Sequence, residues 1–584
     1  MTNTHTVEER NFTTHDGVQL FYRRWPAATS PRRGAILLFH RGHEHGGRMA
    51  HLVDELNLPD FDFYAWDARG HGLSPGARGD SPSLGHSLRD IQSFVDHLCQ
   101  TFDLQEVDMA VIAQSVGAVL ASAWAHDYAP GIRCQVLASP AFKVKLYVPL
   151  ARPGLRFLRA LRGNFFVKSY VKSKFLTHDP ERQKSFDADP LISRAISVNI
   201  LLGLYEAAER VVSDAEAITI PTQLLISGDD WVVHHWPQHA FFARLGTTAK
   251  EKHVLPGFYH DTLGERYRAE AVGKARDFIR RQFEAPLNRP NLRDEHKHGH
   301  TFEEAKNLSV PYPPLSLPGL YWRLYRFLVK VAGYLSDGVK LGHATGFDSG
   351  GSLDYIYRNT PSGKTFLGRI IDRVYLNAIG WRGIRQRKLH LEEILKRVMR
   401  DLKQEKRPVR ILDIAAGHGR YVLDALEDDL RPDAILLRDF NELNIAKGRA
   451  LIAERGLEEI ARFEKGDAFD RDDLAAITPK ATVGIVSGLY ELFTDNDMLA
   501  ESLAGLHGAI EENGYLIYTG QPWHPQLEMI ARALTSHRDG VAWVMRRRTQ
   551  AEMDQLVREA GFEKIAERID EWGIFSVSLA RRQG

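Results

Sequence analysis

Cysteine is scarce in this chain of 584 residues, which contains only Cys99 and Cys134. Two cysteines cannot form a disulfide framework, and such scarcity is typical of proteins in a reducing compartment. The first eleven residues are polar and lack the apolar core of a secretory signal. No run approaches the roughly 18 consecutive apolar residues of a membrane-spanning helix. We therefore expect a cytoplasmic protein.

The chain also lacks an excess of charge of either sign, because its formal net charge is only +1. A balance near zero gives no general attraction to nucleic acid, and we expect no nucleic-acid partner. The apolar fraction of 43% is ordinary for a globular protein. A length of 584 residues exceeds what one hydrophobic core usually holds, which predicts two or three domains.

Two regions of alternating strand and helix patterns predict an α/β protein. Residues 10–283 alternate short apolar runs with longer helical patterns, as in mostly parallel sheets covered by helices. A helical pattern over residues 319–404 leads into a second such region at residues 405–584. We expect each region to form its own domain.

Between the two regions, residues 284–318 contain six prolines around a polar stretch. This composition predicts an interdomain linker. His296, His298 and His300 lie in it at a spacing that could bind metal. A solvated linker is the simpler interpretation of these histidines.

A serine in a small-residue turn marks the first candidate site. The sequence Ala-Gln-Ser-Val-Gly at 113–117 follows an apolar run and places Ser115 where a strand would turn into a helix. This is the pattern of a nucleophile elbow, whose serine needs a base that a carboxylate orients. Asp230 and His260 follow in the order serine, acid, histidine. We predict Ser115 as nucleophile, Asp230 as acid and His260 as base. Asp229 stays open as the alternative acid.

Two further motifs give this region a family resemblance. They are His-Arg-Gly-His-Glu-His at 40–45 and Asp-Ala-Arg-Gly-His-Gly-Leu-Ser at 67–74. With the serine, acid and histidine above, they resemble the monoacylglycerol lipase and lysophospholipase branch of the α/β-hydrolases over about residues 10–280. The resemblance implies an α/β-hydrolase fold and a small-molecule or lipid ester as substrate.

Acyl transfer also needs two N–H donors for the developing oxyanion. We expect one from Val116, the residue after the nucleophile. The family resemblance implies Gly42 as the other, although the family usually has glycine where this chain has Arg41. Without the resemblance, His43 and His45 could be metal ligands. No carboxylate or cysteine stands at ligand spacing, so we predict no metal.

An insertion of roughly residues 141–215 takes the place of a cap, so we expect a helical cap on the hydrolase fold. From Lys143 to Lys174 it is basic, without Asp or Glu, and is interleaved with aromatic and apolar residues. This predicts either docking to an anionic surface, such as the inner membrane face, or a cap helix whose apolar face packs on the core. The segment 321–334 has a similar composition and could be an interfacial or a packed helix.

The second candidate site begins with an apolar strand at 411–416 that opens onto Gly-His-Gly. Glycines let the backbone approach a ligand closely where a strand turns into a helix. Asp439 ends the next predicted strand, where a carboxylate can hold ribose hydroxyls. A third strand leads to Gly-Asp-Ala at 466–468, with an acid suited to adenine.

This series resembles the class I S-adenosylmethionine-dependent methyltransferases over about residues 405–580. The resemblance implies a Rossmann-like fold and S-adenosyl-L-methionine as cofactor. A nicotinamide cofactor, or a fold that has lost its cofactor, remains the alternative. By resemblance the methionine part contacts Asp413, Ala415, Gly417 and Gly419, the ribose contacts Asp439, and the adenine contacts Asp467 and Ala468.

The methyl acceptor is not evident from the sequence. Tyr490, Glu491 and His524 follow predicted strands and either face the acceptor or are plain loop residues. Residues 346–355 and 380–385 precede the core and predict a helical lid on the cofactor pocket. The two sites together predict a bifunctional enzyme, an ester hydrolase joined to a methyltransferase. The alternative is an active hydrolase whose second half only senses the cofactor or acts as a scaffold.

Overall fold

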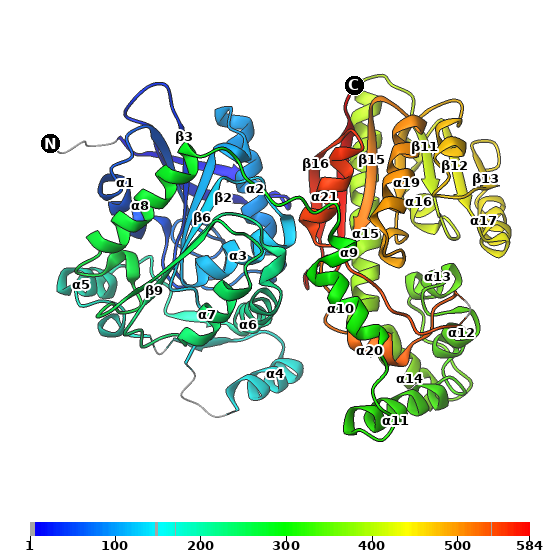
Figure 1. Cartoon of the computed structure of the whole chain (residues 1–584), viewed down its shortest axis with the longest axis horizontal. Coiled ribbons are helices and arrows are strands. Elements are labelled where there is room, and N and C mark those ends of the chain that lie inside the picture. Colours follow the sequence, from blue (N-terminus) through cyan, green and yellow to red (C-terminus); the bar gives the residue numbers. More distant parts are fainter. Residues whose placement is uncertain (1–5, 146–149, 170, 539) are drawn as a thin grey trace. The chain divides into compact units, whose positions relative to one another are not determined.

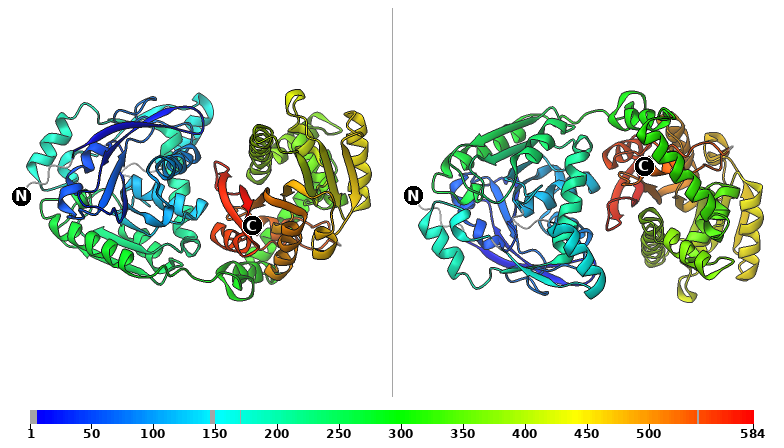
Figure 2. Two further views of the ribbon diagram at one scale, coloured as in Figure 1. Left: turned by 90° about the horizontal axis from the view of Figure 1, so that it is seen from above. Right: turned by 90° about the horizontal axis from the view of Figure 1, so that it is seen from below.

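The computed structural model of the chain divides into two compact units, Met1–Pro290 and Asn291–Gly584 (Figure 1). The structure describes residues 6–145, 150–169, 171–538 and 540–584. Helices cover both faces of the sheet in each unit (Figure 2). No helix in the described residues combines the length and the apolarity needed to cross a membrane.

The first unit contains an eight-stranded sheet in the order β1-β2-β4-β3-β5-β6-β9-β10. In this order the last six strands, β4, β3, β5, β6, β9 and β10, run parallel. Strand β2 is antiparallel to both of its neighbours. This arrangement, with a helix after each parallel strand, is the predicted α/β-hydrolase fold. The strands are β1 (Glu8–Thr13), β2 (Gln19–Trp25), β3 (Gly34–Phe39), β4 (Phe61–Trp66), β5 (Met109–Gln114), β6 (Cys134–Ala138), β9 (Thr222–Ser227) and β10 (Lys250–Leu255).

Central strands of this sheet are buried along their whole length because helices pack on both faces. Ile36 of β3 and Ile112 of β5 face one side, where they share a core with α1 and α8. The other face carries α2, α3 and α6. The helices are α1 (His51–Glu55), α2 (Leu84–Phe102), α3 (Val116–Tyr128), α6 (Val198–Ser213), α7 (His235–Arg244) and α8 (Ala269–Glu284).

The predicted cap contains α4 (Ala151–Arg162), β7 (Phe166–Lys168), α5 (Pro180–Ala188), β8 (Ala195–Ser197) and α6. Residues 146–149 and 170 of the predicted range lie outside the described residues.

Helix α4 buries none of its residues. Arg152 and Arg156 pair with Glu209 and Glu206 of α6, whereas Phe157 is 65% exposed. The alternative of an apolar face packed on the core is therefore wrong for α4.

The second unit contains a seven-stranded sheet in the order β13-β12-β11-β14-β15-β17-β16. All neighbours are parallel except β17, which is antiparallel to β15 and β16. This is the predicted Rossmann-like arrangement of a class I methyltransferase. The strands are β11 (Arg410–Ile414), β12 (Ala434–Asp439), β13 (Ala461–Lys465), β14 (Ala481–Val486), β15 (Ile510–Gly520), β16 (Phe562–Ile569) and β17 (Ser576–Arg582).

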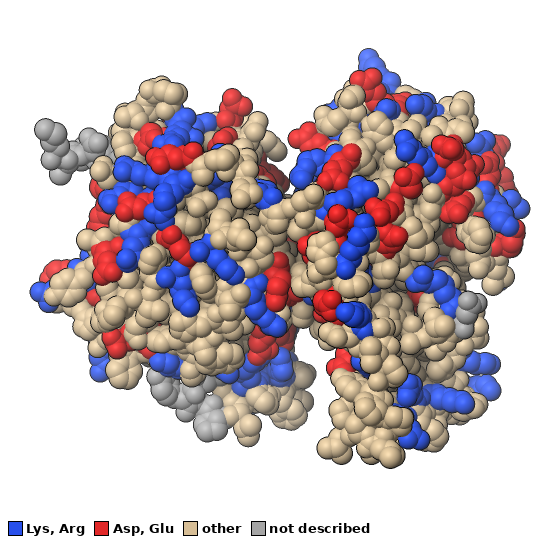
Figure 3. All heavy atoms as spheres, viewed as in Figure 1, with Lys and Arg blue, Asp and Glu red and all other residues tan. Residues whose placement is uncertain are grey.

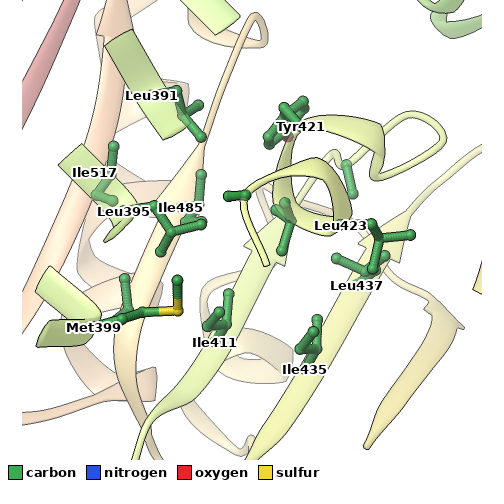
Figure 4. Packing of buried hydrophobic residues seen from close by; sticks show 14 of the residues in the cluster. Leu391, Leu395, Met399, Ile411, Tyr421, Leu423, Ile435, Leu437, Ile485 and Ile517 are labelled. Atoms are coloured by element: carbon green, nitrogen blue, oxygen red, sulfur yellow. The ribbon is translucent and has the colours of Figure 1, made fainter. Parts of the chain in front are cut away.

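One core of this unit lies between its sheet and α15 (Ile379–Gln404). Leu395 and Met399 of α15 point at Ile411 of β11 and Ile485 of β14 (Figure 4). Since side chains alternate along a strand, Leu412, which follows Ile411 in β11, packs on the opposite face of the sheet. The remaining covering helices are α16 (Arg420–Asp424), α17 (Glu442–Glu454), α19 (Asn496–Ala509) and α21 (Gln550–Glu559).

A helical layer precedes the sheet of the second unit in sequence. It shares a hydrophobic core around Phe347, Trp381 and Trp543. The helices are α11 (Leu317–Ala332), α12 (Asp337–Thr345), α13 (Gly350–Arg358), α14 (Phe366–Leu376) and, from later in the chain, α20 (Leu527–Ala533).

The stretch 284–318, predicted as an open linker, is partly helical and mostly belongs to the second unit. It contains α9 (Glu295–His298) and α10 (His300–Ser309), and the second unit begins at Asn291. Glu304 pairs with Arg547 at 2.6 Å, and the Leu292 N–H donates to the side chain of Gln555 at 2.8 Å. These contacts order a segment whose composition alone favours an open chain.

Candidate functional sites

Ser115 occupies the sharp turn between β5 and α3. Its backbone φ of 55° and ψ of −114° are strained values for a residue with a side chain. The turn is held because the Ser115 N–H donates to the Ala138 carbonyl at 2.9 Å. Only glycine fits at 117, because a Cβ there would lie 2.5 Å from the His40 carbonyl oxygen. The small residues of the motif thus let the turn pass close to the end of β3.

The serine, the histidine and one aspartate form a hydrogen-bonded chain. Ser115 Oγ lies 2.7 Å from His260 Nε2, and His260 Nδ1 lies 2.7 Å from Asp230 Oδ2. The other Asp230 oxygen accepts from two backbone N–H groups, at 2.7 and 3.0 Å. All three side chains are buried. Asp229 is exposed and accepts from the Gly257 N–H instead.

The surroundings keep the Asp230 carboxylate ionised. Burial opposes its charge, but the His260 imidazole and the two backbone N–H groups hold the pKa of Asp230 below its ordinary value. An ionised carboxylate in this position orients the imidazole and stabilises the imidazolium that forms when the serine loses its proton. The arrangement can therefore activate the Ser115 hydroxyl as a nucleophile.

The two segments that carry the predicted oxyanion donors lie side by side. A Cβ on Gly42 would lie 2.9 Å from Val116 Cγ2, so the loop after β3 packs against the first turn of α3. Within the described residues, the Val116 N–H at this turn makes no hydrogen bond. A helix N-terminus with a free N–H favours developing negative charge.

His40 and Arg41, which have no predicted role, hold this loop in place. The His40 ring accepts from the Ala68 N–H at 3.1 Å and donates to the Arg41 carbonyl at 2.7 Å. Burial lowers the pKa of His40 to about 4, so the ring stays neutral. The Arg41 guanidinium turns inward and makes two bonds to Glu44. This buried ion pair explains how the loop accommodates an arginine at position 41.

The second unit contains a cavity of about 900 Å³ at the carboxyl ends of β11, β12 and β13. Five of the seven predicted cofactor residues line it. Asp413 and Gly419 do not. A Cβ on Gly419 would lie 2.4 Å from Leu437, so this glycine is needed for packing rather than for ligand contact. The five lining residues are Ala415, Gly417, Asp439, Asp467 and Ala468.

The donors and acceptors around this cavity fit an adenosyl cofactor. Asp439 accepts from the Gly417 N–H at 2.9 Å and stands at the wall beside the loop. Asp413 is fully buried, and the Tyr421 hydroxyl lies beside its carboxyl group. Burial raises the pKa of Asp413 well above its ordinary value. Because Asp413 does not line the cavity, its place is in the support of the loop rather than in contact with a ligand.

The predicted lid contributes to the same cavity. Ser349 caps α13, and Gly350 and Asp354 line the cavity opposite the glycine loop. Asp354 pairs with Arg420, which follows that loop directly. The consecutive glycines at 350 and 351 are the sequence signal that could have identified this contact.

The three candidate acceptor residues separate in the structure. Glu491 and His524 line a second cavity, of about 500 Å³. Tyr490 does not line it, because its ring is buried in the core and its hydroxyl bonds to Ser502 at 2.9 Å. The two neighbours, Tyr490 and Glu491, therefore face opposite ways.

Comparisons with known proteins divide the chain in the same way. Residues 275–582 match the family described as "Putative methyltransferase", and residues 30–267 match the family "Serine aminopeptidase, S33". The "Uncharacterized protein YnbC" of Escherichia coli (strain K12) is 57% identical, and the match covers 100% of this chain and 100% of that protein.

Two relatives match the first unit alone. The monoacylglycerol lipase of Mycolicibacterium smegmatis is 26% identical over 44% of this chain and 92% of its own length. The crystal structure of Paleococcus ferrophilus monoacylglycerol lipase is 23% identical, with a TM-score of 0.40, over 48% of this chain and 99% of that one.

Proposed function

The chain belongs to the methyltransferase family that matches residues 275–582, and we propose that the chain is a bifunctional enzyme. Its first unit is a hydrolase domain of monoglyceride-lipase type. The first unit is a serine ester hydrolase, and the second transfers methyl groups from S-adenosyl-L-methionine. The observation that carries the proposal is the chain Ser115–His260–Asp230, with both links at 2.7 Å.

In the hydrolase reaction, Ser115 Oγ attacks the ester carbonyl while His260 Nε2 takes the hydroxyl proton. The Asp230 carboxylate stabilises the imidazolium that results. The N–H groups of Val116 and Gly42 would donate to the oxygen that becomes negative. His260 then passes its proton to the leaving alcohol, and water cleaves the acyl-enzyme by the same steps. The likeness to monoacylglycerol lipases supports an ester of a glycerolipid or lysolipid as substrate.

In the second unit, bound S-adenosyl-L-methionine would supply an electrophilic methyl group on a sulfonium centre. Asp439 would hold the ribose hydroxyls, and Asp467 with Ala468 would hold the adenine. The loop residues Ala415 and Gly417 would lie against the methionine part. Ala415 has a φ of 57°, a conformation rare for a residue with a side chain and concentrated at ligand sites.

We also propose that the first unit contacts an anionic membrane surface through α4. The exposed side chains Phe157 and Leu161 lie on the same short helix as Arg159 and Arg162. Apolar and basic residues together bind the interface of anionic lipids. The two free cysteines support a reducing compartment such as the cytoplasm.

The proposal is tested by two variants in two assays. We expect Ser115→Ala to abolish release of acid from a monoacylglycerol while binding of the methyl donor is unchanged. We expect Asp439→Ala to reduce transfer of labelled methyl groups to a cell lipid extract, because the methyl donor binds more weakly, while ester hydrolysis continues. Unchanged hydrolysis by Ser115→Ala would overturn the first activity. Absence of any labelled product with the unaltered chain would overturn the second, and would favour a half that only binds the cofactor.

A further inference from the structure

The second cavity of the second unit has mostly apolar walls. It measures about 500 Å³ and shares Asp348, Leu353 and Gly488 with the cofactor cavity, so the two cavities adjoin. Cavities of this size and character hold medium-sized apolar ligands. Its aromatic wall residues are Tyr325, Phe347, Tyr375, Trp381, Trp543 and Phe575.

Buried N–H donors interrupt this apolar wall. Arg387 Nε, Gln521 Nε2 and Trp543 Nε1 have no hydrogen-bond partner within the described part of the chain. Arg387 and Gln521 are each only 3% exposed. A buried donor without a partner destabilises a protein, and a ligand with oxygen acceptors would relieve that cost.

His524 adds a fourth donor to this group. Its Nδ1 accepts from the Gln526 N–H at 3.0 Å, so the proton of the neutral ring lies on Nε2. Burial lowers the pKa of His524 to about 3, which keeps the ring neutral. The imidazole therefore offers a donor and is not placed to take a proton from a ligand.

Glu491 is one of two acidic residues that line the cavity, and the other, Asp348, accepts from the Ser536 hydroxyl and the His537 N–H. Oε1 of Glu491 accepts from the Thr519 hydroxyl at 3.1 Å and lies 3.5 Å from Arg387 Nη1. Its Oε2 is buried without a partner among the described residues. Four residues with a donor N–H and one residue with a free carboxylate oxygen therefore line this cavity, which favours a ligand rich in oxygen lone pairs.

The walls of the cavity continue into an exposed apolar surface. Val374 of α14 lines the cavity and is 69% exposed, and Phe366 on the same helix is 73% exposed. Tyr325 and Val329 of α11 also line the cavity, and Phe327 beside them is 61% exposed. Large exposed apolar surfaces of this kind mark contacts with lipid or protein.

The charges around this surface are basic. Helix α11 carries Arg323, Arg326 and Lys330 and no acidic residue. Helix α14 carries Arg369 and Arg373, while its one acid, Asp372, is fully buried. Figure 3 shows this end of the second unit, in the lower part of the view, as basic and uncharged residues with few acidic ones. Basic and apolar side chains together favour an anionic lipid surface over a protein partner.

We infer that the cavity receives the methyl acceptor, and that the acceptor is a long-chain carboxylic acid that enters from an anionic lipid surface at α11 and α14. This inference rests on the proposed methyltransferase function. One carboxylate oxygen forms a bond to the methyl carbon of the sulfonium donor, the carbon–sulfur bond breaks, and its electron pair stays on sulfur. A carboxylate brings no proton to remove, which matches a site with donors and a neutral His524. Ester hydrolysis in the first unit releases acids of this class.

Binding of palmitic acid and of hexadecanol tests the ligand class. Displacement of a fluorescent fatty acid from the full chain in the Ser115→Ala background should show the acid binding at least about ten-fold more tightly than the alcohol, because charged hydrogen bonds favour it. Arg387→Gln should remove most of that difference. Ala332→Trp should fill the cavity and weaken binding, whereas the matched control Leu328→Trp, at an exposed position of the same helix, should not. Equal binding of acid and alcohol, or unchanged binding in Ala332→Trp, would overturn the inference.

Transfer of a labelled methyl group tests the acceptor role. The full chain is incubated with labelled methyl donor and phosphatidylglycerol vesicles that contain palmitic acid. We expect methyl palmitate by mass spectrometry, with less product when the acid is presented in neutral phosphatidylcholine vesicles. Label on other lipids of a cell extract with none on acids would overturn the inference and leave the methyltransferase in place. Failure of the unaltered chain to bind the methyl donor in calorimetry would instead overturn the proposed function.

Discussion

Asp439, at the end of β12, accepts a hydrogen bond of 2.9 Å from the N–H of Gly417 in the loop after β11. The Asp439 carboxylate therefore holds the glycine loop in place and also lines the predicted cofactor cavity of the second unit. The first prediction follows from this double role.

Replacing Asp439 with Ala should weaken binding of S-adenosyl-L-methionine by about ten-fold or more, because hydrogen bonds to a charged group contribute about 1.5–3 kcal/mol. Calorimetry measures the effect. Asp433→Ala is the matched control, because Asp433 accepts from the Val409 N–H at the opposite end of the same strands. Equal affinities in the two variants would count against the predicted cofactor site.

The choice of triad acid gives a second prediction. Asp230→Asn should lower kcat for ester hydrolysis by roughly 10³–10⁴-fold, because the imidazole loses its orienting charge. Asp229→Asn should leave kcat essentially unchanged, since Asp229 is exposed and accepts from the Gly257 N–H rather than from His260. Steady-state kinetics with a short acyl ester separates the two. Loss of activity in Asp229→Asn alone would reverse the assignment.

A third prediction concerns the elbow. Gly117→Ala should lower the free energy of unfolding by about 1–3 kcal/mol, because the new Cβ would overlap the end of β3. It should also reduce ester hydrolysis. Gly154→Ala in α4 is the control, since nothing lies within 4 Å of its Cβ position. Thermal unfolding checks both variants, and a Gly117→Ala protein as stable as the control would contradict the packing described here.

The fourth prediction is a pH dependence of stability. Burial lowers the pKa of His40 from 6.5 to about 4 in the folded chain. Between these values the unfolded chain binds the proton and the folded chain does not, so the free energy of unfolding falls as pH decreases from 6.5 towards 4. The loss is about 1.4 kcal/mol per pKa unit at most.

Thermal unfolding at pH 7 and at acid pH tests this dependence. His40→Gln should lose less stability on acidification than the unaltered chain. His298→Gln should behave like the unaltered chain, because His298 is exposed. Identical acid sensitivity in all three proteins would argue against a neutral, buried His40.

Much of the fold could be predicted because the sequences of buried parallel strands are continuous apolar runs. The run 109–113 corresponds to β5 (Met109–Gln114) for this reason. The stretch 284–318 was harder, because its prolines favour an open chain while contacts made by Leu292 and Glu304 with distant residues order it. Local composition does not encode such contacts.

The candidate sites show the same limit. Motif order was enough to select Ser115 and His260, but sequence could not decide between Asp229 and Asp230, because neighbouring residues in a tight turn point in different directions. Tyr490 and Glu491 separate for the same reason. The orphaned donors of the second cavity come from segments far apart in the chain, so no motif could indicate them.

Labelling by a fluorophosphonate probe shows whether Ser115 is a nucleophile, because the probe forms a bond only with an activated serine. We expect a single adduct on the peptide that contains Ser115, absent from Ser115→Ala and from His260→Ala, and unaffected in Ser122→Ala, whose serine is buried in α3. No adduct on the unaltered chain, or an adduct on a different serine, would contradict this prediction.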